Sequence, residues 1–149
     1  MAVYNGCHVP DDRLYDVAGD LWVRFEGDLA RVGMTDVAQT RMGKMVSIHF
    51  KRAGRRVEPG GSVATVESSK WVGPIHTPFG GEIVEPNEGA FQDDILIANR
   101  DPYEAGWITV IRPEDTSHPH RRLVSGDEAW EAYRERIDEL EIRCYRCAD

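Results

Sequence analysis

Closely spaced glycine, proline and asparagine residues divide most of this chain into short segments with the composition of β-strands. Residues 45–50 alternate apolar and polar side chains, which is the period of a strand with one buried face. Comparable segments occupy residues 21–25, 29–33, 62–68, 72–78, 82–85 and 107–111. Many short strands separated by such turns predict a barrel or sandwich that is mainly β.

Two segments near the N-terminus do not follow this pattern. Residues 1–20 contain turn-forming residues without a clear period, and we expect them to be irregular. Residues 36–42 have the pattern of a short helix, and Thr35 stands where an N-cap side chain is needed. The regular β-structure is therefore expected to begin at residue 21.

The C-terminal part changes from strand patterns to a helical one. A polar linker at residues 117–122 comes first, and Ser125 with Glu128 then forms a capping-box signature. Apolar side chains recur at helical spacing at Trp130, Tyr133, Ile137 and Leu140. This spacing predicts an amphipathic helix over residues 126–142, whose apolar stripe we expect to dock on the β-structure.

Composition excludes several classes of partner. Hydrophobic residues make up 41% of the chain and charged residues 30%, which is typical of a folded globular protein. The formal net charge of −8 repels nucleic acid and anionic membrane surfaces. No apolar run has the length of a membrane span, and no signal peptide is visible, so a cytoplasmic protein is expected.

Lysine is rare in this chain, and one lysine has an unusual position. The lysines are Lys44, Lys51 and Lys70. Lys70 follows the predicted strand 62–68 and comes before the next one, so we expect it at the tip of a hairpin. An exposed primary amine at such a turn suits the attachment of a prosthetic group through an amide bond. The alternative is an ordinary surface lysine in a β-turn.

The three cysteines, Cys7, Cys144 and Cys147, give no disulfide framework by their number. An odd count without a secretion signal argues against one. Cys144 and Cys147 have C-x-x-C spacing, but no second pair is present to complete a zinc site, so no metal site is predicted. All three are candidate redox residues, and the alternative is that the tail cysteines have no function.

Five stretches between about residues 14 and 113 resemble, in family order, the glycine-cleavage H protein and its lipoyl-carrier relatives. The stretches are residues 21–24, 32–39, 66–70, 78–88 and 99–107. The run Glu-Ser-Ser-Lys at residues 67–70 also differs from biotin carriers, which place methionines around their lysine. The resemblance therefore points to a lipoyl carrier.

This resemblance implies a flattened lipoyl/biotinyl-type barrel-sandwich with short helices, followed here by the C-terminal amphipathic helix. It implies lipoate bound covalently through an amide to Lys70, and Glu67 as a residue that the lipoate-attaching enzyme recognises. The carrier domain would span residues 1–116, including an N-terminal extension. Residues 117–149 would hold the linker, the helix and the Cys-x-x-Cys tail.

Other residues resemble a more specialised group of lipoyl carriers. Trp71 and Val72 follow the lysine, where H proteins have small residues, and Asp20-Leu21-Trp22 replaces their His-Glu-Trp triplet. The chain is instead similar to the lipoate-binding proteins of bacterial sulfur oxidation at Asn5-Gly6-Cys7, at Tyr15-Asp16-Val17, at residues 67–74 and in the Cys-x-x-Cys tail. Those proteins work with a heterodisulfide-reductase-like complex. The resemblance implies that the lipoyl arm carries sulfur-bound intermediates.

Two alternatives remain open from the sequence. One is a glycine-cleavage H protein that carries an aminomethyl group between glycine-cleavage enzymes, with dihydrolipoamide dehydrogenase as a further partner. The other is an unmodified β-barrel that binds a partner through its helical tail, with Lys70 unused. An independent enzyme is not expected, because no Ser/His/Asp set, phosphate loop or paired-carboxylate motif stands out.

Overall fold

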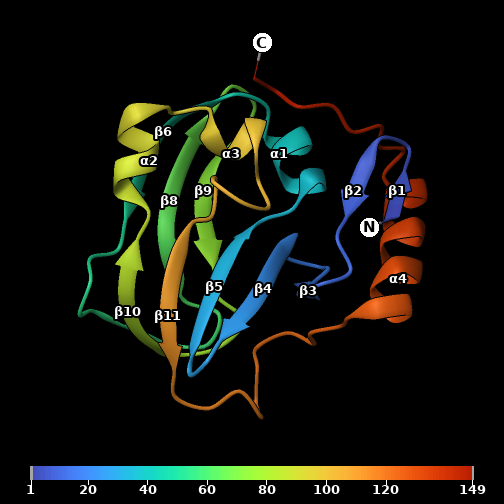
Figure 1. The fold of residues 1–149 in the computed structure, drawn as a ribbon. Helices are drawn as coiled ribbons and strands as arrows, with labels where there is room; N and C mark the ends of the chain where they lie inside the picture. The colour runs from blue at the N-terminus through green and yellow to red at the C-terminus, as the bar shows by residue number, and fades with distance from the viewer. Residues whose placement is uncertain (1, 149) are drawn as a thin grey trace.

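The computed structural model describes residues 2–148 and contains two main β-sheets with short helices around them (Figure 1). The strands are β1 (Ala2–Tyr4), β2 (Cys7–Val9), β3 (Leu14–Asp16), β4 (Leu21–Glu26), β5 (Leu29–Met34), β6 (Met45–Phe50), β7 (Arg56–Val57), β8 (Ser62–Ser68), β9 (Val72–His76), β10 (Gly81–Pro86) and β11 (Thr109–Pro113). The helices are α1 (Asp36–Met42), α2 (Glu88–Asp93), α3 (Ile97–Arg100) and α4 (Gly126–Glu139).

One sheet has six strands in the order β3-β4-β5-β11-β10-β7, and the other has three in the order β6-β8-β9. In Figure 1 the three-stranded sheet lies behind the larger one. Buried side chains from both sheets form one core, including Val32 and Ile111 from the larger sheet and Val63 and Val66 from the smaller. The predicted fold class is confirmed as mainly β with short helices and a C-terminal helix, but the sheets do not close into a barrel.

The N-terminal segment differs from the sequence-based expectation. The described part of the predicted irregular segment, residues 2–20, contains β1, β2 and β3. Asn5 and Gly6 both have positive φ, 50° and 78°, and turn β1 back onto β2 in an antiparallel ribbon. Each strand has only three residues, so no alternation of side chains was long enough to predict it. The short helices α2 and α3 were also not predicted, because their sequences show no clear helical spacing of apolar residues.

The helix predictions are confirmed in part. Thr35 caps α1, and its hydroxyl accepts a hydrogen bond from the Ala38 N–H at 3.2 Å. Helix α4 ends at Glu139 rather than at residue 142, and its predicted capping box is wrong because Ser125 makes no side-chain cap hydrogen bond. Glu128 pairs instead with Arg122 at 2.5 Å.

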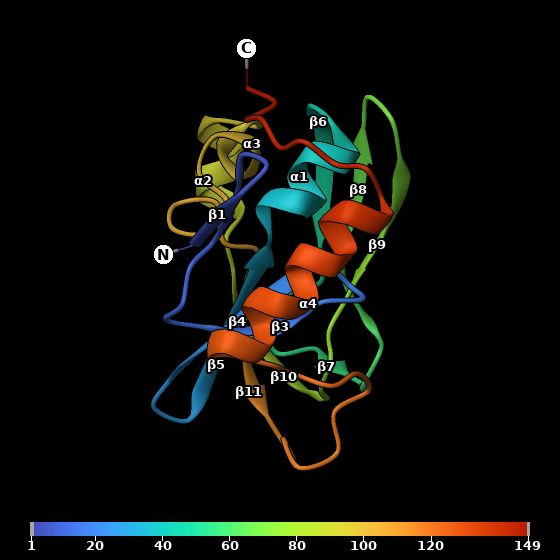
Figure 2. The same cartoon turned by 90° about the vertical axis from the view of Figure 1, so that its right-hand side faces the viewer.

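Helix α4 packs on β1 and on β3, the edge strand of the six-stranded sheet, so its apolar stripe docks on the β-structure. Figure 2 shows it lying across this side, with the C-terminal tail running from its end over α1. Ile137 is fully buried there, and the Tyr133 ring meets the Tyr15 ring edge-on at 5.5 Å. The chain thus has a second core between its two ends. Within residues 2–148, no helix is both long and apolar enough to cross a membrane.

Candidate functional site

Lys70 lies in the exposed turn that joins β8 to β9, as the hairpin prediction requires. The buried hydroxyl of Ser68 fixes this turn: it donates to the Met42 carbonyl at 2.7 Å and accepts from the Trp71 N–H at 3.1 Å. The Ser69 N–H donates to the Lys44 carbonyl at 2.9 Å. The turn is therefore tied to the loop that follows α1, while the Lys70 amine stays accessible.

Glu67 precedes the turn in β8, and its side chain is exposed. It lies opposite Val72 in β9 and opposite Ser47 in β6. Val72 is 67% exposed, so the strand positions around Glu67 form an accessible surface beside the lysine. An enzyme that approaches Lys70 from solvent would meet this carboxylate.

A hollow of about 360 Å³ opens next to Lys70, and we call it the arginine hollow. Its apolar wall includes Leu21, Met34, Met42, Trp71 and Ile75. Its charged lining consists of Asp20, Arg41, Lys70, Arg121 and Arg136. Three guanidinium groups against one carboxylate give the lining a positive balance, even without the lysine amine.

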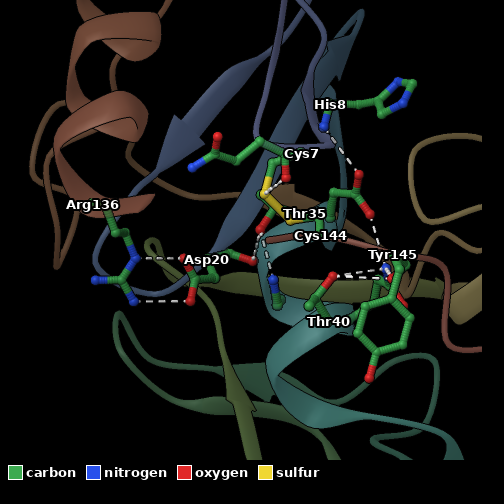
Figure 3. Close-up of a disulfide and its surroundings, with 12 residues drawn as sticks. Cys7, His8, Asp20, Thr35, Thr40, Arg136, Cys144 and Tyr145 are labelled. Carbon is green, nitrogen blue, oxygen red and sulfur yellow. Dashed lines mark hydrogen bonds and ion pairs between the residues drawn. A yellow bond between two sulfur atoms is a disulfide. The ribbon is translucent and has the colours of Figure 1, made fainter. Parts of the chain in front are cut away.

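Asp20 organises the charged side of the arginine hollow. Arg136 reaches it from α4 with two contacts, Nε to Oδ1 at 2.8 Å and Nη2 to Oδ2 at 2.9 Å (Figure 3). Arg41 of α1 approaches the same carboxylate at 3.4 Å. The hydrogen bond to Asp20 raises the pKa of the Arg136 guanidinium above its usual value. The pair thus fixes α4 against the wall of the hollow.

Arg121 enters the hollow from the linker before α4. Its partner is the buried Asp16, at a longer distance of 3.9 Å. Burial raises the pKa of the Asp16 carboxyl, while the hydrogen bond from the Gly19 N–H opposes that rise. The pairing is looser than that of Arg136, so the Arg121 guanidinium keeps more capacity for a further anion.

A second hollow, of about 370 Å³, lies on another side of Lys70 and is formed with the C-terminal tail. Its lining includes Lys44, Ser69, Tyr145, Arg146 and Cys147. The tail is held on α1: its Tyr145 carbonyl accepts hydrogen bonds from Gln39 Nε2 at 2.7 Å and Thr40 Oγ1 at 3.2 Å (Figure 3). This hollow is more polar than the arginine hollow.

The cysteines are arranged differently from the sequence-based expectation. Cys7 and Cys144 form a disulfide, with Cα atoms 4.8 Å apart across 137 positions of sequence (Figure 3). The odd cysteine count was therefore misleading, because only Cys147 is left over as a buried free thiol. The C-x-x-C spacing drew attention to the wrong pair. Of the three candidate redox residues, Cys147 alone lines a hollow that also contains Lys70.

Sequence reasoning missed the arginines of the hollow. Arg41, Arg121 and Arg136 come from α1, the linker and α4, and they meet only because α4 folds back beside α1. Asp20 was noticed as a departure from a family triplet, but its two arginine partners were not. In the sequence, the only sign of this charged cluster was an acidic residue directly before a predicted strand.

The comparisons with known proteins agree on one family. The model of the glycine cleavage H-protein matches residues 13–136. Glycine cleavage system H protein 2 of Aquifex aeolicus is 39% identical over 142 residues, covering 95% of this chain and 88% of that protein. Probable glycine cleavage system H protein 2 of Sulfolobus acidocaldarius is 39% identical over 149 residues, covering 98% of this chain and 99% of that protein.

Comparison of the fold with solved structures indicates the same family. The crystal structure of a glycine cleavage system H protein from Mycobacterium marinum superposes with a TM-score of 0.71 and 31% sequence identity. The match covers 90% of this chain and 100% of the other. With the family model matching most of the chain and an exposed lysine at the hairpin turn, the chain belongs to the glycine cleavage H-protein family.

Proposed function

We propose that this chain is a lipoyl carrier, with the lipoyl group bound by an amide to Lys70, and that it serves partner enzymes without catalysing a reaction itself. One observation carries the proposal: in a member of the H-protein family, the hairpin turn presents a lysine that is exposed on a rigid backbone. Glu67, exposed beside it, is the proposed recognition residue for the lipoate-attaching enzyme.

The residues around Lys70 fit such a group. Its amine is accessible for acylation, and the arginine hollow beside it offers an apolar wall that suits a hydrocarbon chain and a sulfur-containing ring. When bound, the lipoyl group supplies thiol–disulfide exchange and the transfer of a sulfur-linked cargo. Ser68 holds the turn in place, and the apolar wall of the hollow would cover one side of a lipoyl arm that extends from Lys70.

The first candidate for the cargo is an aminomethyl group. The relatives from Aquifex aeolicus and Sulfolobus acidocaldarius are named glycine cleavage system H proteins. By this similarity, the partners of the chain would be the glycine-cleavage enzymes, a lipoate-attaching enzyme and dihydrolipoamide dehydrogenase. The cargo would then carry an amine that is protonated and positive at neutral pH.

A second candidate, an anionic sulfur cargo, is favoured by the charge of the arginine hollow. Arg41, Arg121 and Arg136 line it and outnumber the two carboxylates that face them, Asp20 in the lining and Asp16 behind Arg121. Guanidinium groups attract oxidised sulfur anions and repel a protonated amine. In this case the partner would be a heterodisulfide-reductase-like complex of oxidative sulfur metabolism.

Intact-mass measurement tests the carrier function directly. The purified chain is incubated with a lipoate-attaching enzyme, lipoate and ATP, and we expect one lipoyl mass on the wild type and on Lys44→Arg. Lys70→Arg should gain none, because arginine offers no amine that can be acylated. Unmodified wild type, or a lipoyl mass on Lys70→Arg, would reject the proposal.

The cargo is tested with the lipoylated protein. It is offered to the glycine decarboxylase P-protein with isotope-labelled glycine, and the label on the Lys70 peptide is measured. Efficient labelling supports the aminomethyl cargo and removes the sulfur alternative. No labelling, in a preparation that is fully lipoylated and labels a standard H protein in parallel, supports the anionic cargo.

A further inference from the structure

Trp71 and Gly73 form an unusual pair beside Lys70. Trp71 ends the turn directly before β9, and Gly73 is the second residue of that strand. A Cβ atom placed on Gly73 would lie 2.5 Å from Cζ2 of the Trp71 indole. The indole therefore rests directly on the Gly73 backbone, and only glycine leaves room for it there.

Apart from its packing on Gly73, the indole differs from the other three tryptophans in its surroundings. Trp22, Trp107 and Trp130 each make an aromatic or cation–π contact. Within residues 2–148, no such contact involves Trp71, and its side chain is 42% exposed. A large exposed indole held in one place is a surface that a ligand can cover.

The exposed part of this indole belongs to the arginine hollow. Trp71 lines it together with Lys70, Met42 and Ile75. The second hollow also contains Lys70, but its other lining residues are mainly polar and come from the loop after α1, from Ser69 and from the tail. An apolar ring attached to Lys70 would therefore be better placed in the arginine hollow than in the second one.

We propose that Trp71 is a positioning residue for the prosthetic group on Lys70, with its indole, set by Gly73, forming the wall on which the lipoyl dithiolane ring rests. The inference relies on the proposed lipoylation of Lys70. Sulfur atoms pack favourably on aromatic rings, and Lys70, from which the arm would extend, lines the same hollow as Trp71. Trp71 thereby shelters the disulfide of the resting arm from solvent.

The first test measures how accessible the oxidised arm is. Lipoylated protein is treated with a small phosphine reductant, quenched with iodoacetamide at intervals, and alkylation is read on the Lys70 peptide. We expect Trp71→Ala to be reduced about two- to tenfold faster than the wild type, because the arm loses its contact with the ring. Gly73→Ala should show the same increase, since its methyl group displaces the indole while leaving it in the chain.

Matched variants separate a positioning role from a structural one. Trp71→Phe should restore most of the slow reduction, because it keeps an aromatic ring at this place. Val72→Ala changes the neighbouring residue, which is 67% exposed and does not line the arginine hollow, and should react like the wild type. Circular dichroism of each variant establishes that it is folded.

The second test is spectroscopic and does not depend on the arm's chemistry. Lipoylation should quench part of the tryptophan emission of the wild type, and this change should be absent in Trp71→Phe and in Gly73→Ala. Gly73→Ala retains all four tryptophans, so its loss of quenching would report the displaced indole alone.

The outcomes distinguish this inference from the proposed function. If wild type, Trp71→Ala and Gly73→Ala all carry lipoate and are reduced at one rate, the positioning role of Trp71 is overturned and the carrier function stands. If the wild type gains no lipoyl mass, both are overturned together.

Discussion

The Lys70 turn and the layer formed by the two chain ends are held in opposite ways. The terminal layer comprises residues 2–9, α4 and residues 141–148, and it is joined by a buried disulfide, by α4 packing and by hydrogen bonds to α1. The Lys70 turn, residues 68–71, is held by backbone pairing and one buried hydroxyl, with its lysine in solvent. The terminal layer is cross-linked and buried, whereas the Lys70 turn leaves its side chain exposed to solvent.

This difference explains how a small protein can present one amine without loosening its fold. The terminal layer also reaches the Lys70 region from two sides, since Arg136 of α4 lines one hollow and Cys147 of the tail lines the other. Substitutions in the terminal layer should therefore change mainly the free energy of unfolding. Substitutions in the turn should change mainly the lipoylation of Lys70.

The largest loss of stability is expected from opening the Cys7–Cys144 disulfide. Because it closes a loop of 137 positions, the entropy of the unfolded chain predicts a loss of about 5 kcal/mol in the free energy of unfolding. Cys7→Ser should show this loss in urea denaturation, and the wild type should show it only in the presence of a reductant. Lys70 should still be lipoylated under conditions where the variant is folded.

Cys147→Ser is the control for the disulfide, because Cys147 is a free thiol. It should keep the stability of the wild type and lose stability on reduction by the same amount. Equal stability of Cys7→Ser and wild type without reductant would show that the terminal layer does not depend on this cross-link.

The second largest loss of stability is expected from Ile137→Ala in α4. Ile137 is fully buried between the helix and the N-terminal strands, and its truncation should lower the free energy of unfolding by about 3 kcal/mol. The exposed Glu135→Ala on the same helix is the control and should change it little. If Ile137→Ala is as stable as the control, α4 is not part of the folded core.

Local features of this fold were readable from the sequence, whereas long-range ones were not. The alternation at residues 45–50 and the Thr35 cap predicted β6 and the start of α1, because both depend on neighbouring residues. The turn at Lys70 followed from its flanking strands. Strands of three residues, such as β1, carry too little pattern to be recognised.

The place of Lys70 in the fold was predictable from the sequence, whereas the residues that surround it were not. Lys70 and Glu67 lie in one continuous motif, so a family resemblance could find them. The Cys7–Cys144 pair and the contact of Arg136 with Asp20 join residues more than one hundred positions apart. No local spacing encodes such contacts, and the C-x-x-C motif even favoured another pairing.

A smaller loss of stability is expected from Gln39→Ala. Gln39 belongs to α1, which holds the C-terminal tail beside the Lys70 turn. The buried Gln39 side chain donates to the Tyr145 carbonyl at 2.7 Å and accepts from the Cys147 N–H at 3.1 Å. Its loss should cost about 2 kcal/mol, since buried polar groups are left without partners. The tail should loosen, and alkylation of Cys147 should become faster. An unchanged alkylation rate would contradict the proposed hold of α1 on the tail.

The smallest change in stability, but a marked one in modification, is expected from Ser68→Ala. The Ser68 hydroxyl holds the turn through the Met42 carbonyl and the Trp71 N–H, and its removal should cost about 1 kcal/mol. A less ordered turn presents Lys70 in more conformations, so the initial rate of lipoylation should fall. Ser62→Ala, at the far end of β8, is the matched control and should be lipoylated at the wild-type rate. If Ser68→Ala is modified as fast as this control, the attaching enzyme does not need a rigid turn, and the contrast between a rigid terminal layer and a merely accessible lysine becomes sharper still.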